Sequence, residues 1–297
     1  MKTIVVFGYT GTVGQYVMST LSNYDCVVRG VSRNPKNWLN TGKNNQKVSY
    51  VSANLQNPEE VESACAFSDC VFLLTATHPK QVAYEKNVID AAKKTGVKRI
   101  VKLSAPDIKP HNLVEVSAWH REIEQYLEKS GIEFCCLRPY AFMQNWERNT
   151  FTIRKFGKFF GSMDKAPRNY IDARDVAEVA AKYLLSAESL PFKYLTLTGP
   201  EAINHYDMAQ RLSKATQNKI AYINVSPNQQ LNNLVKKAKV PEWLAKHVME
   251  LDNLAKQVPE PREPNIERIL GKKPRIMNAY LQEVRDKFRR EPLWKFW

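Results

Sequence analysis

The stretch VVFGYTGTVGQ (residues 5–15) decides how this chain begins to fold. Directly after an apolar run it places three glycines, Gly8, Gly11 and Gly14, at intervals of three residues. The preceding run KTIVVF is rich in β-branched residues and predicts a short strand, whereas the residues from Thr12 onward have apolar side chains at helical spacing. A glycine-rich turn between a strand and a helix is typical of a nucleotide-binding unit.

Each glycine of this turn has a task that a side chain would obstruct. Gly8 permits the tight turn, Gly11 lets the backbone approach a pyrophosphate, and Gly14 lets the helix pack against the strand. The first turn of the helix then offers backbone N–H groups and a partial positive charge to phosphates. The spacing is GxxGxxG and not the commoner GxGxxG, so a chance turn is the alternative interpretation. We expect cofactor contacts at the three glycines and at the residues between and beside them, Thr10, Thr12 and Val13.

The residue after the second predicted strand indicates which dinucleotide binds. An NAD site usually has Asp or Glu there, which holds the ribose hydroxyls. This chain has Arg33 at that position and Lys36 close behind. A guanidinium forms two charge-assisted hydrogen bonds to one phosphate, so Arg33 favours NADP(H) over NAD. A surface arginine without a ligand is the alternative.

The first two-thirds of the chain alternates short apolar runs with amphipathic stretches. The apolar runs include CVVRGVSR, VSYVSANL, CVFLLTAT, RIVKLSAP and EFCCLRPY. Such strands, separated by helices, predict an α/β fold with a doubly wound parallel sheet that helices cover on both faces. After Gly199 the pattern becomes mainly helical. We therefore expect a nucleotide-binding core over residues 1–199 and a smaller helical region over 200–297 that packs on it.

The composition indicates a globular protein, with 43% apolar and 25% charged residues. No apolar run approaches the roughly 18 to 20 residues of a membrane helix. The first residues do not resemble a secretory signal, and the five cysteines form no CxxC pair. We therefore expect reduced thiols and a cytoplasmic location.

The formal net charge is +14, of which residues 1–150 contribute 18 − 14 = +4 and the remainder 26 − 16 = +10. A basic half can serve nucleic acid, an anionic membrane or a phosphate-bearing ligand, but a solvated surface is the simpler interpretation. The tail RDKFRREPLWKFW interleaves basic and aromatic residues. Leu281, Val284 and Phe288 share one helical face there, which favours a docked terminal helix over nucleic-acid or membrane binding.

With these motifs in place, the whole chain resembles the NmrA-like family of atypical short-chain dehydrogenases. The resemblance is carried by GYTGTVG, VKRIVKLSA, HREIEQYLEKSGIEFCCLRPYAFMQN, YIDARDVAEVAAKYL and YLTLTGPEAINHYDMAQRLS. It implies an extended Rossmann fold that binds NADP(H), with a substrate-facing loop at 140–170 and a C-terminal region facing the substrate cleft. It also implies cofactor contacts at Asn54 and Leu55, where the family often has Asp-Leu. The family contains NADPH-dependent quinone and azo-dye reductases as well as catalytically silent redox sensors that bind a protein partner.

The related dehydrogenases use a Tyr-x-x-x-Lys pair on the helix after the serine-bearing strand. Aligning HREIEQYL with that helix places Val116 at the tyrosine position and His120 at the lysine position, while Ser104 matches the serine. Because the proton-donating tyrosine is absent, we do not expect ordinary alcohol–ketone chemistry. Direct hydride transfer to a quinone or conjugated acceptor stays open, since the acceptor needs positioning more than a strong acid.

His120 has a reference pKa of about 6.5 and could donate a hydrogen bond or a proton to a reduced oxygen. A histidine that only contacts the ribose or the helix is the alternative. We take His120, Ser104 and Tyr140 as candidate catalytic residues, with His120 also a cofactor contact. His120 and Glu124 are one helical turn apart and could form half of a metal site. No further ligands accompany the pair, so we expect no metal.

Further candidates follow from the rule that ligands bind beyond the carboxyl ends of parallel strands. The run LLTATHP places Thr75, Ala76 and Thr77 near the nicotinamide half of the cofactor. The run RPYAFMQNW places aromatic and methionine side chains, which suit a flat apolar acceptor or an ordinary core, after the sixth strand.

The sequence therefore predicts an NADPH-binding oxidoreductase that passes hydride to a small quinoid or aromatic acceptor. The alternative is a catalytically silent NADP(H) sensor that regulates a protein partner. The sequence leaves the substrate, the partner and the oligomeric state open.

Overall fold

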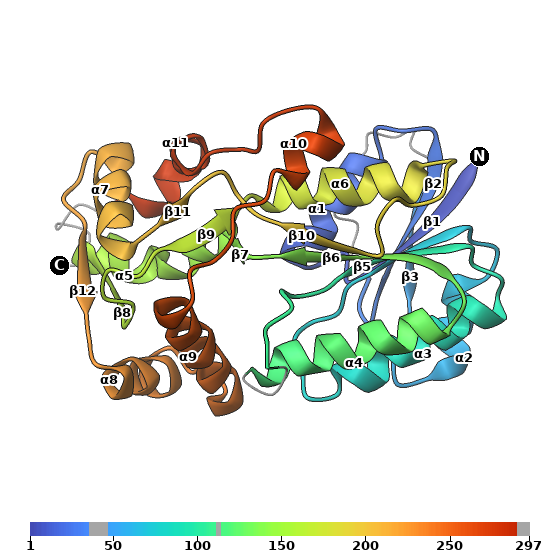
Figure 1. Cartoon of the computed structure of the whole chain (residues 1–297), viewed down its shortest axis with the longest axis horizontal. Coiled ribbons are helices and arrows are strands. Elements are labelled where there is room, and N and C mark those ends of the chain that lie inside the picture. Colours follow the sequence, from blue (N-terminus) through green and yellow to red (C-terminus); the bar gives the residue numbers. More distant parts are fainter. Residues whose placement is uncertain (36–46, 111–113, 290–297) are drawn as a thin grey trace. The chain divides into compact units, whose positions relative to one another are not determined.

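The computed structural model describes residues 1–35, 47–110 and 114–289 (Figure 1). The chain forms two compact units and passes between them several times. The first unit comprises residues 1–139, 173–197 and 265–272, and the second comprises 140–172, 198–264 and 273–297. The division expected from the sequence, a core of 1–199 with an appended region of 200–297, stays a prediction.

A seven-stranded parallel sheet forms the centre of the first unit, and its strand order is β10-β6-β5-β4-β1-β2-β3. The order reverses between β1 and β4, which confirms the predicted doubly wound sheet. The strands are β1 (Lys2–Phe7), β2 (Cys26–Ser32), β3 (Val48–Ser52), β4 (Cys70–Leu73), β5 (Arg99–Leu103), β6 (Glu133–Pro139) and β10 (Tyr194–Leu197).

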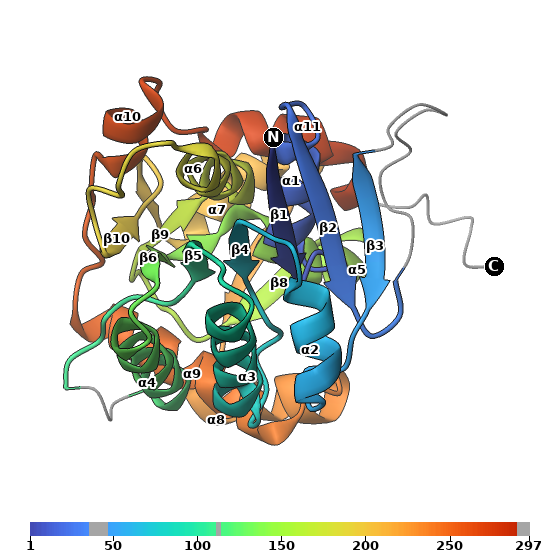
Figure 2. The ribbon, with the colours of Figure 1, turned by 90° about the vertical axis from the view of Figure 1, so that its right-hand side faces the viewer.

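Helices cover both faces of this sheet (Figure 2). On one face lie α1 (Thr12–Leu21) and α6 (Ala173–Leu185), and on the other lie α2 (Pro58–Cys65), α3 (Gln81–Lys94) and α4 (Glu115–Lys129). The short helix α10 (Asn265–Leu270) returns to the first unit, where the Asn265 amide donates a hydrogen bond to the Thr196 carbonyl of β10. Apolar residues of the strands are buried on both faces, as the near-continuous apolar runs predict.

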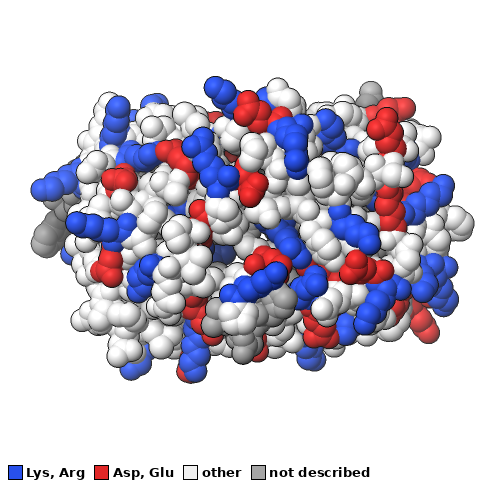
Figure 3. All heavy atoms as spheres, viewed as in Figure 1, with Lys and Arg blue, Asp and Glu red and all other residues white. Residues whose placement is uncertain are grey.

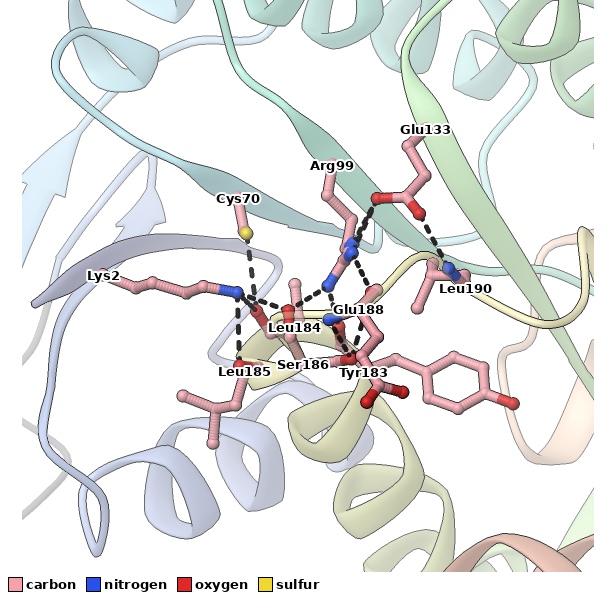
Figure 4. A network of polar contacts seen from close by, with 10 residues as sticks. All are labelled: Lys2, Cys70, Arg99, Glu133, Tyr183, Leu184, Leu185, Ser186, Glu188 and Leu190. Carbon is pink, nitrogen blue, oxygen red and sulfur yellow. Dashed lines mark hydrogen bonds and ion pairs between the residues drawn. The ribbon is translucent and has the colours of Figure 1, made fainter.

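The amino ends of β1 and β5 hold the end of α6 (Figure 4). Lys2 Nζ donates hydrogen bonds to the carbonyls of Leu184, Leu185 and Ser186 at 3.3, 3.2 and 2.6 Å. The Arg99 guanidinium donates to the carbonyls of Tyr183, Ser186 and Glu188 at 2.6–2.8 Å and pairs with Glu133. Positive charge therefore meets the negative end of the helix dipole, which stabilises the helix against the sheet.

The second unit contains two small sheets and several helices. The sheets have the orders β11-β9-β7 and β12-β8. Their strands are β7 (Ala141–Phe142), β8 (Lys158–Gly161), β9 (Arg168–Ile171), β11 (Ala202–Ile203) and β12 (Ala221–Asn224). The helices are a 3₁₀ helix η1 (Met143–Asn149), α5 (Thr150–Phe156), α7 (His205–Thr216), α8 (Pro227–Asn232), a π-helical turn η2 (Asn233–Lys237), α9 (Glu242–Gln257) and α11 (Met277–Phe288).

The terminal helix α11 is docked within the second unit, as the apolar face of the tail predicts. Leu281 and Phe288 are buried, and they belong to a core that also contains Trp146, Phe159 and Met277. The tail from residue 290 onward lies outside the described residues.

Basic and acidic side chains are interspersed on the face shown in Figure 3. Among the helices of the described residues, none is long and apolar enough to cross a bilayer.

Candidate functional site

The glycine turn after β1 excludes side chains at two of its three glycines. Gly8 has a φ of +70°, and a β-carbon there would lie 2.3 Å from the Leu74 carbonyl oxygen. A β-carbon on Gly14 would lie 2.2 Å from the Gly8 carbonyl oxygen. At Gly11 the nearest atom would be 3.4 Å away, an ordinary contact. The turn's own packing therefore requires Gly8 and Gly14, whereas Gly11 leaves room for a ligand to approach the backbone.

The start of α1 is open to an anion. Gly11 occupies the N-cap position in an extended conformation, and no side chain caps the helix there. Thr10, Gly11 and Thr12 are exposed, whereas the Val13 side chain is buried in the core, so only its backbone can face a ligand. Uncapped N–H groups with the positive end of the helix dipole suit a phosphate.

Arg33 is exposed directly after β2, at the same edge of the sheet as the glycine turn. Its carbonyl accepts a hydrogen bond from Ser52 Oγ at 3.0 Å, which ties the segment to the end of β3. Lys36, the second predicted cation, lies outside the described residues. Arg33 therefore follows the strand that pairs with β1, the strand before the glycine turn.

Asn54 and Leu55 form the turn between β3 and α2. The Asn54 side chain accepts a hydrogen bond from the Gln56 N–H at 3.1 Å, and the Leu55 carbonyl accepts one from the Asn87 amide at 2.8 Å. Local structure therefore accounts for Asn54, and its cofactor contact stays a prediction.

A buried ion pair lies where β4 and β5 end. Lys102 of β5 and Glu85 of α3 are both fully buried, and Lys102 Nζ donates a hydrogen bond to Glu85 Oε2. The same ammonium donates to the Leu103 carbonyl at 3.2 Å and lies 3.2 Å from His120 Nδ1 on α4. The other oxygen, Glu85 Oε1, accepts hydrogen bonds from Thr75 Oγ1 at 2.7 Å and Gln81 Nε2 at 2.9 Å. One carboxylate thus organises a polar cluster at the carboxyl edge of the sheet, which we call the Glu85 cluster: Thr75, Gln81, Glu85, Lys102 and His120.

Of the three predicted nicotinamide contacts, Thr75 has its hydroxyl turned toward Glu85, while Ala76 and Thr77 are exposed. Glu85, Gln81 and Lys102 of this cluster were not among the residues predicted from the sequence. The lysine within the apolar run RIVKLSAP was the available signal, because a charge in a strand buried on both faces needs a buried partner.

Ser104 follows β5 and belongs to a second polar group. Its hydroxyl donates a hydrogen bond to Glu124 Oε1 at 2.8 Å, and Arg138 binds both oxygens of Glu124 at 2.9 and 2.5 Å. A serine hydroxyl has one proton, so donation to a substrate carbonyl requires the Glu124 hydrogen bond to break. Both oxygens of Glu124 are therefore bound by Arg138. In the part of the chain that the structure describes, no group of three or more His, Cys, Asp or Glu side chains could hold a metal ion.

The family model of the NmrA-like family matches residues 1–281. The chain belongs to the NmrA-like family. An NAD(P)H azoreductase of Xenophilus azovorans is 29% identical over 252 residues, which cover 85% of this chain and 87% of the relative. This NmrA-like chain also resembles two solved structures. One is an Escherichia coli NADPH-dependent quinone oxidoreductase complexed with NADPH (TM-score 0.81, 21% identity, 95% and 99% of the two chains covered). The other is NmrA, a negative transcriptional regulator (TM-score 0.76, 17% identity, 96% of each chain covered).

Val116, which the sequence predicts to stand at the position of the dehydrogenase tyrosine, is buried on α4. The third catalytic candidate, Tyr140, begins the second unit, whereas His120 and Ser104 belong to the first, so their grouping stays a prediction. Burial, with Glu260 nearby, raises the pKa of Tyr140 to about 12, which keeps its phenol protonated.

Proposed function

We propose that this NmrA-like protein is an NADPH-dependent oxidoreductase that passes hydride to a small, flat acceptor of quinoid or azo-aromatic type. The observation that carries the proposal is the placement of two features at one edge of the parallel sheet. The glycine turn with Arg33 lies at the ends of β1 and β2, and the Glu85 cluster lies at the ends of β4 and β5. Ligands of open α/β sheets bind at this edge, where the strand order reverses.

The residues present fit a dinucleotide phosphate. Gly11 leaves room for a ligand to approach its backbone, and the first turn of α1 has no side-chain cap. The backbone N–H groups of Thr12 and Val13 would hold the pyrophosphate, and Arg33 would hold the 2′-phosphate. NADPH, when bound, supplies the hydride.

The side chains of this chain orient the acceptor and stabilise the charge it gains. His120 donates a hydrogen bond to the oxygen or nitrogen on which negative charge develops. Without a tyrosine at position 116, no strong acid accompanies that donor, which suits acceptors whose reduced form is a stabilised anion. The azoreductase and quinone oxidoreductase to which the chain is similar support this acceptor class.

The test is steady-state oxidation of NADPH by the purified protein with a panel of quinones and azo dyes. We expect turnover with some members of the panel, and His120→Ala lowers kcat roughly 100-fold. Glu122→Ala is the matched control, because Glu122 lies on the same helix in a surface pair with Lys86. Tight NADPH binding without turnover on any acceptor would overturn the proposal.

That outcome would favour the second candidate, a redox sensor that binds NADP(H) and a protein partner. Val116 at the tyrosine position is the observation that favours it. Under either function we place the protein in the cytosol, since all five cysteines are free, buried thiols.

A further inference from the structure

We propose that the second unit docks on membrane surfaces that contain anionic lipid, through exposed aromatic and basic side chains of α5 together with the basic and aromatic residues that follow α11. The side chains of α5 are those of Phe151, Arg154, Lys155 and Phe156, which we call the α5 patch. The proposal concerns an interaction surface, and it does not depend on the oxidoreductase activity.

Two large apolar side chains of α5 are exposed to solvent. Phe151 is 66% exposed and Phe156 is 48% exposed, whereas Ile153 of the same helix is buried in the core of the second unit. The two phenylalanine rings are neighbours, with their centroids 6.3 Å apart in an edge-to-face arrangement. Single exposed apolar side chains are ordinary, but a contacting pair of phenylalanines forms a continuous apolar surface whose removal from water is favourable.

The α5 patch is also basic. Lys155 Nζ lies over both rings, 5.6 Å from the centroid of Phe151 and 5.5 Å from that of Phe156. Arg154 is exposed as well, and the sequence of α5 contains no acidic residue. Phenylalanines and cations on the exposed side of a helix are typical of segments that lie in the interface of an anionic membrane. The rings enter the boundary of the acyl chains there, and the cations stay at the headgroup phosphates.

The helix α11 brings a second segment of the same composition to α5. It packs against α5, and its last residue, Phe288, belongs to the same buried core as Ile153. The sequence that follows α11 is RREPLWKFW (residues 289–297), with three cations and four apolar residues, of which three are aromatic. Aromatic side chains, Trp above all, prefer the membrane–water interface. The docked helix predicted from the sequence therefore accounts for the apolar positions up to Phe288, whereas the composition after it matches that of the α5 patch.

The net charge of these two segments fits an anionic partner. Residues 147–158 and 277–297 contain nine Lys and Arg and four Asp and Glu, which gives 9 − 4 = +5. Each cation held at an anionic membrane surface raises the affinity roughly fivefold. The cytosolic location proposed above is compatible with this partner, because the cytoplasmic leaflet carries the anionic lipids.

Nucleic acid fits the α5 patch less well than lipid does. Single-stranded nucleic acid binds to aromatic side chains by stacking successive bases on their ring faces. The rings of Phe151 and Phe156 meet edge to face, and the Lys155 ammonium lies over both, so the pair does not form a continuous platform for stacking. A lipid interface requires only apolar surface and positive charge.

Sedimentation of the purified full chain with lipid vesicles tests the proposal. The probes are phosphatidylcholine vesicles and vesicles in which about one-third of the lipid is phosphatidylglycerol. We expect binding to the anionic vesicles at low salt, at least roughly tenfold weaker binding at about 0.5 M salt, and none to phosphatidylcholine alone. Absence of binding to the anionic vesicles would overturn the proposal, and so would binding to a single-stranded oligonucleotide in its place.

Two double variants test the α5 patch itself. Phe151→Ser with Phe156→Ser removes the apolar surface, and Arg154→Gln with Lys155→Gln removes the charge. Each should weaken binding to the anionic vesicles roughly tenfold or more. Because all four side chains are exposed, both variants should unfold at the urea midpoint of the wild-type protein, which separates lost docking from lost folding.

The matched controls change the same residue types elsewhere on the surface. Phe67→Ser removes a phenylalanine that is 94% exposed, and Lys193→Gln with Lys246→Gln removes two exposed cations. Both controls should bind the vesicles as the wild-type protein does, whereas deletion of residues 290–297 should weaken binding as much as the α5 variants. Unchanged binding in both α5 variants, or an equal loss in the controls, would overturn the proposal. A dimer that requires residues 290–297 and binds no vesicles would assign the patch to a second copy of the chain and overturn it as well.

Discussion

Gly14 lies directly over Gly8, so closely that a β-carbon on Gly14 would sit 2.2 Å from the Gly8 carbonyl oxygen. Gly11, between them, has no such neighbour. The three glycines therefore divide into two that the turn requires for its own packing and one that is available for a ligand.

This division predicts opposite behaviour for two alanine substitutions. Gly14→Ala should lower the free energy of unfolding by roughly 1–3 kcal/mol, because the turn must shift to admit the methyl group. Gly11→Ala should change it by about 0.5 kcal/mol or less but raise the Kd for NADPH at least roughly tenfold, since the methyl group meets the ligand. Urea unfolding and NADPH titration measure both; normal NADPH affinity in Gly11→Ala would contradict the assignment of this turn.

Arg33 should determine the preference for NADPH over NADH. Arg33→Ala removes charge-assisted hydrogen bonds worth about 1.5–3 kcal/mol, so NADPH should bind roughly 10- to 100-fold more weakly while NADH binding is unchanged. Lys47→Ala is the matched control, since Lys47 is an exposed cation that pairs with Asp25 before β3. Equal affinities of the wild-type protein for the two cofactors would remove Arg33 from the site.

Two half-buried histidines of the second unit, His205 and His247, should make stability fall in mild acid. His205 packs against Trp146, Phe159 and Tyr222, and burial, with Arg168 nearby, lowers its pKa to about 4. Above pH about 6.5 its ring is neutral in both states, and its contribution to stability is complete. As the pH falls from about 6.5 to about 4, the unfolded chain takes up a proton that the folded chain does not. This proton uptake lowers the free energy of unfolding by about 2 kcal/mol at pH 5.

The measurement is urea unfolding of the wild-type protein and of His205→Gln at pH 7.5 and at about pH 5. The difference between the two pH values should shrink by about 2 kcal/mol in the variant. Burial also lowers the pKa of His247 to about 4, so part of the pH dependence should remain. The same difference between the two pH values in His205→Gln as in the wild-type protein would contradict the assignment.

Lys2 should affect stability without affecting the cofactor. It binds the last carbonyls of α6 from the amino edge of the sheet, opposite the edge that holds the glycine turn. Lys2→Met should lower the free energy of unfolding by about 1–2 kcal/mol and leave the Kd for NADPH unchanged. A higher Kd for NADPH in the folded variant would show that the amino and carboxyl edges of the sheet are coupled.

The sequence predicted the parallel sheet well because its strands are buried on both faces and read as continuous apolar runs such as CVFLL and RIVKL. It did not predict the sheet of β11, β9 and β7, since β7 and β11 have two residues each and show no periodicity. Of the Glu85 cluster it named Thr75 and His120 only. Lys102 in an apolar strand indicates a buried charge. Its partner Glu85 is 17 positions away on α3, and only the packing of α3 on the sheet brings the two together.

The return of α10 to the first unit bears on how this protein can be divided. Lys182 of α6 donates a hydrogen bond to the Ile269 carbonyl, and Lys272 pairs with Glu178 at 2.5 Å. A chain ended at Gly199 would lose these contacts and expose the α6 surface that α10 covers. The first unit is therefore not one contiguous segment that can be cut out or exchanged between relatives. An exchange that keeps this unit intact must include residues 265–272 as well.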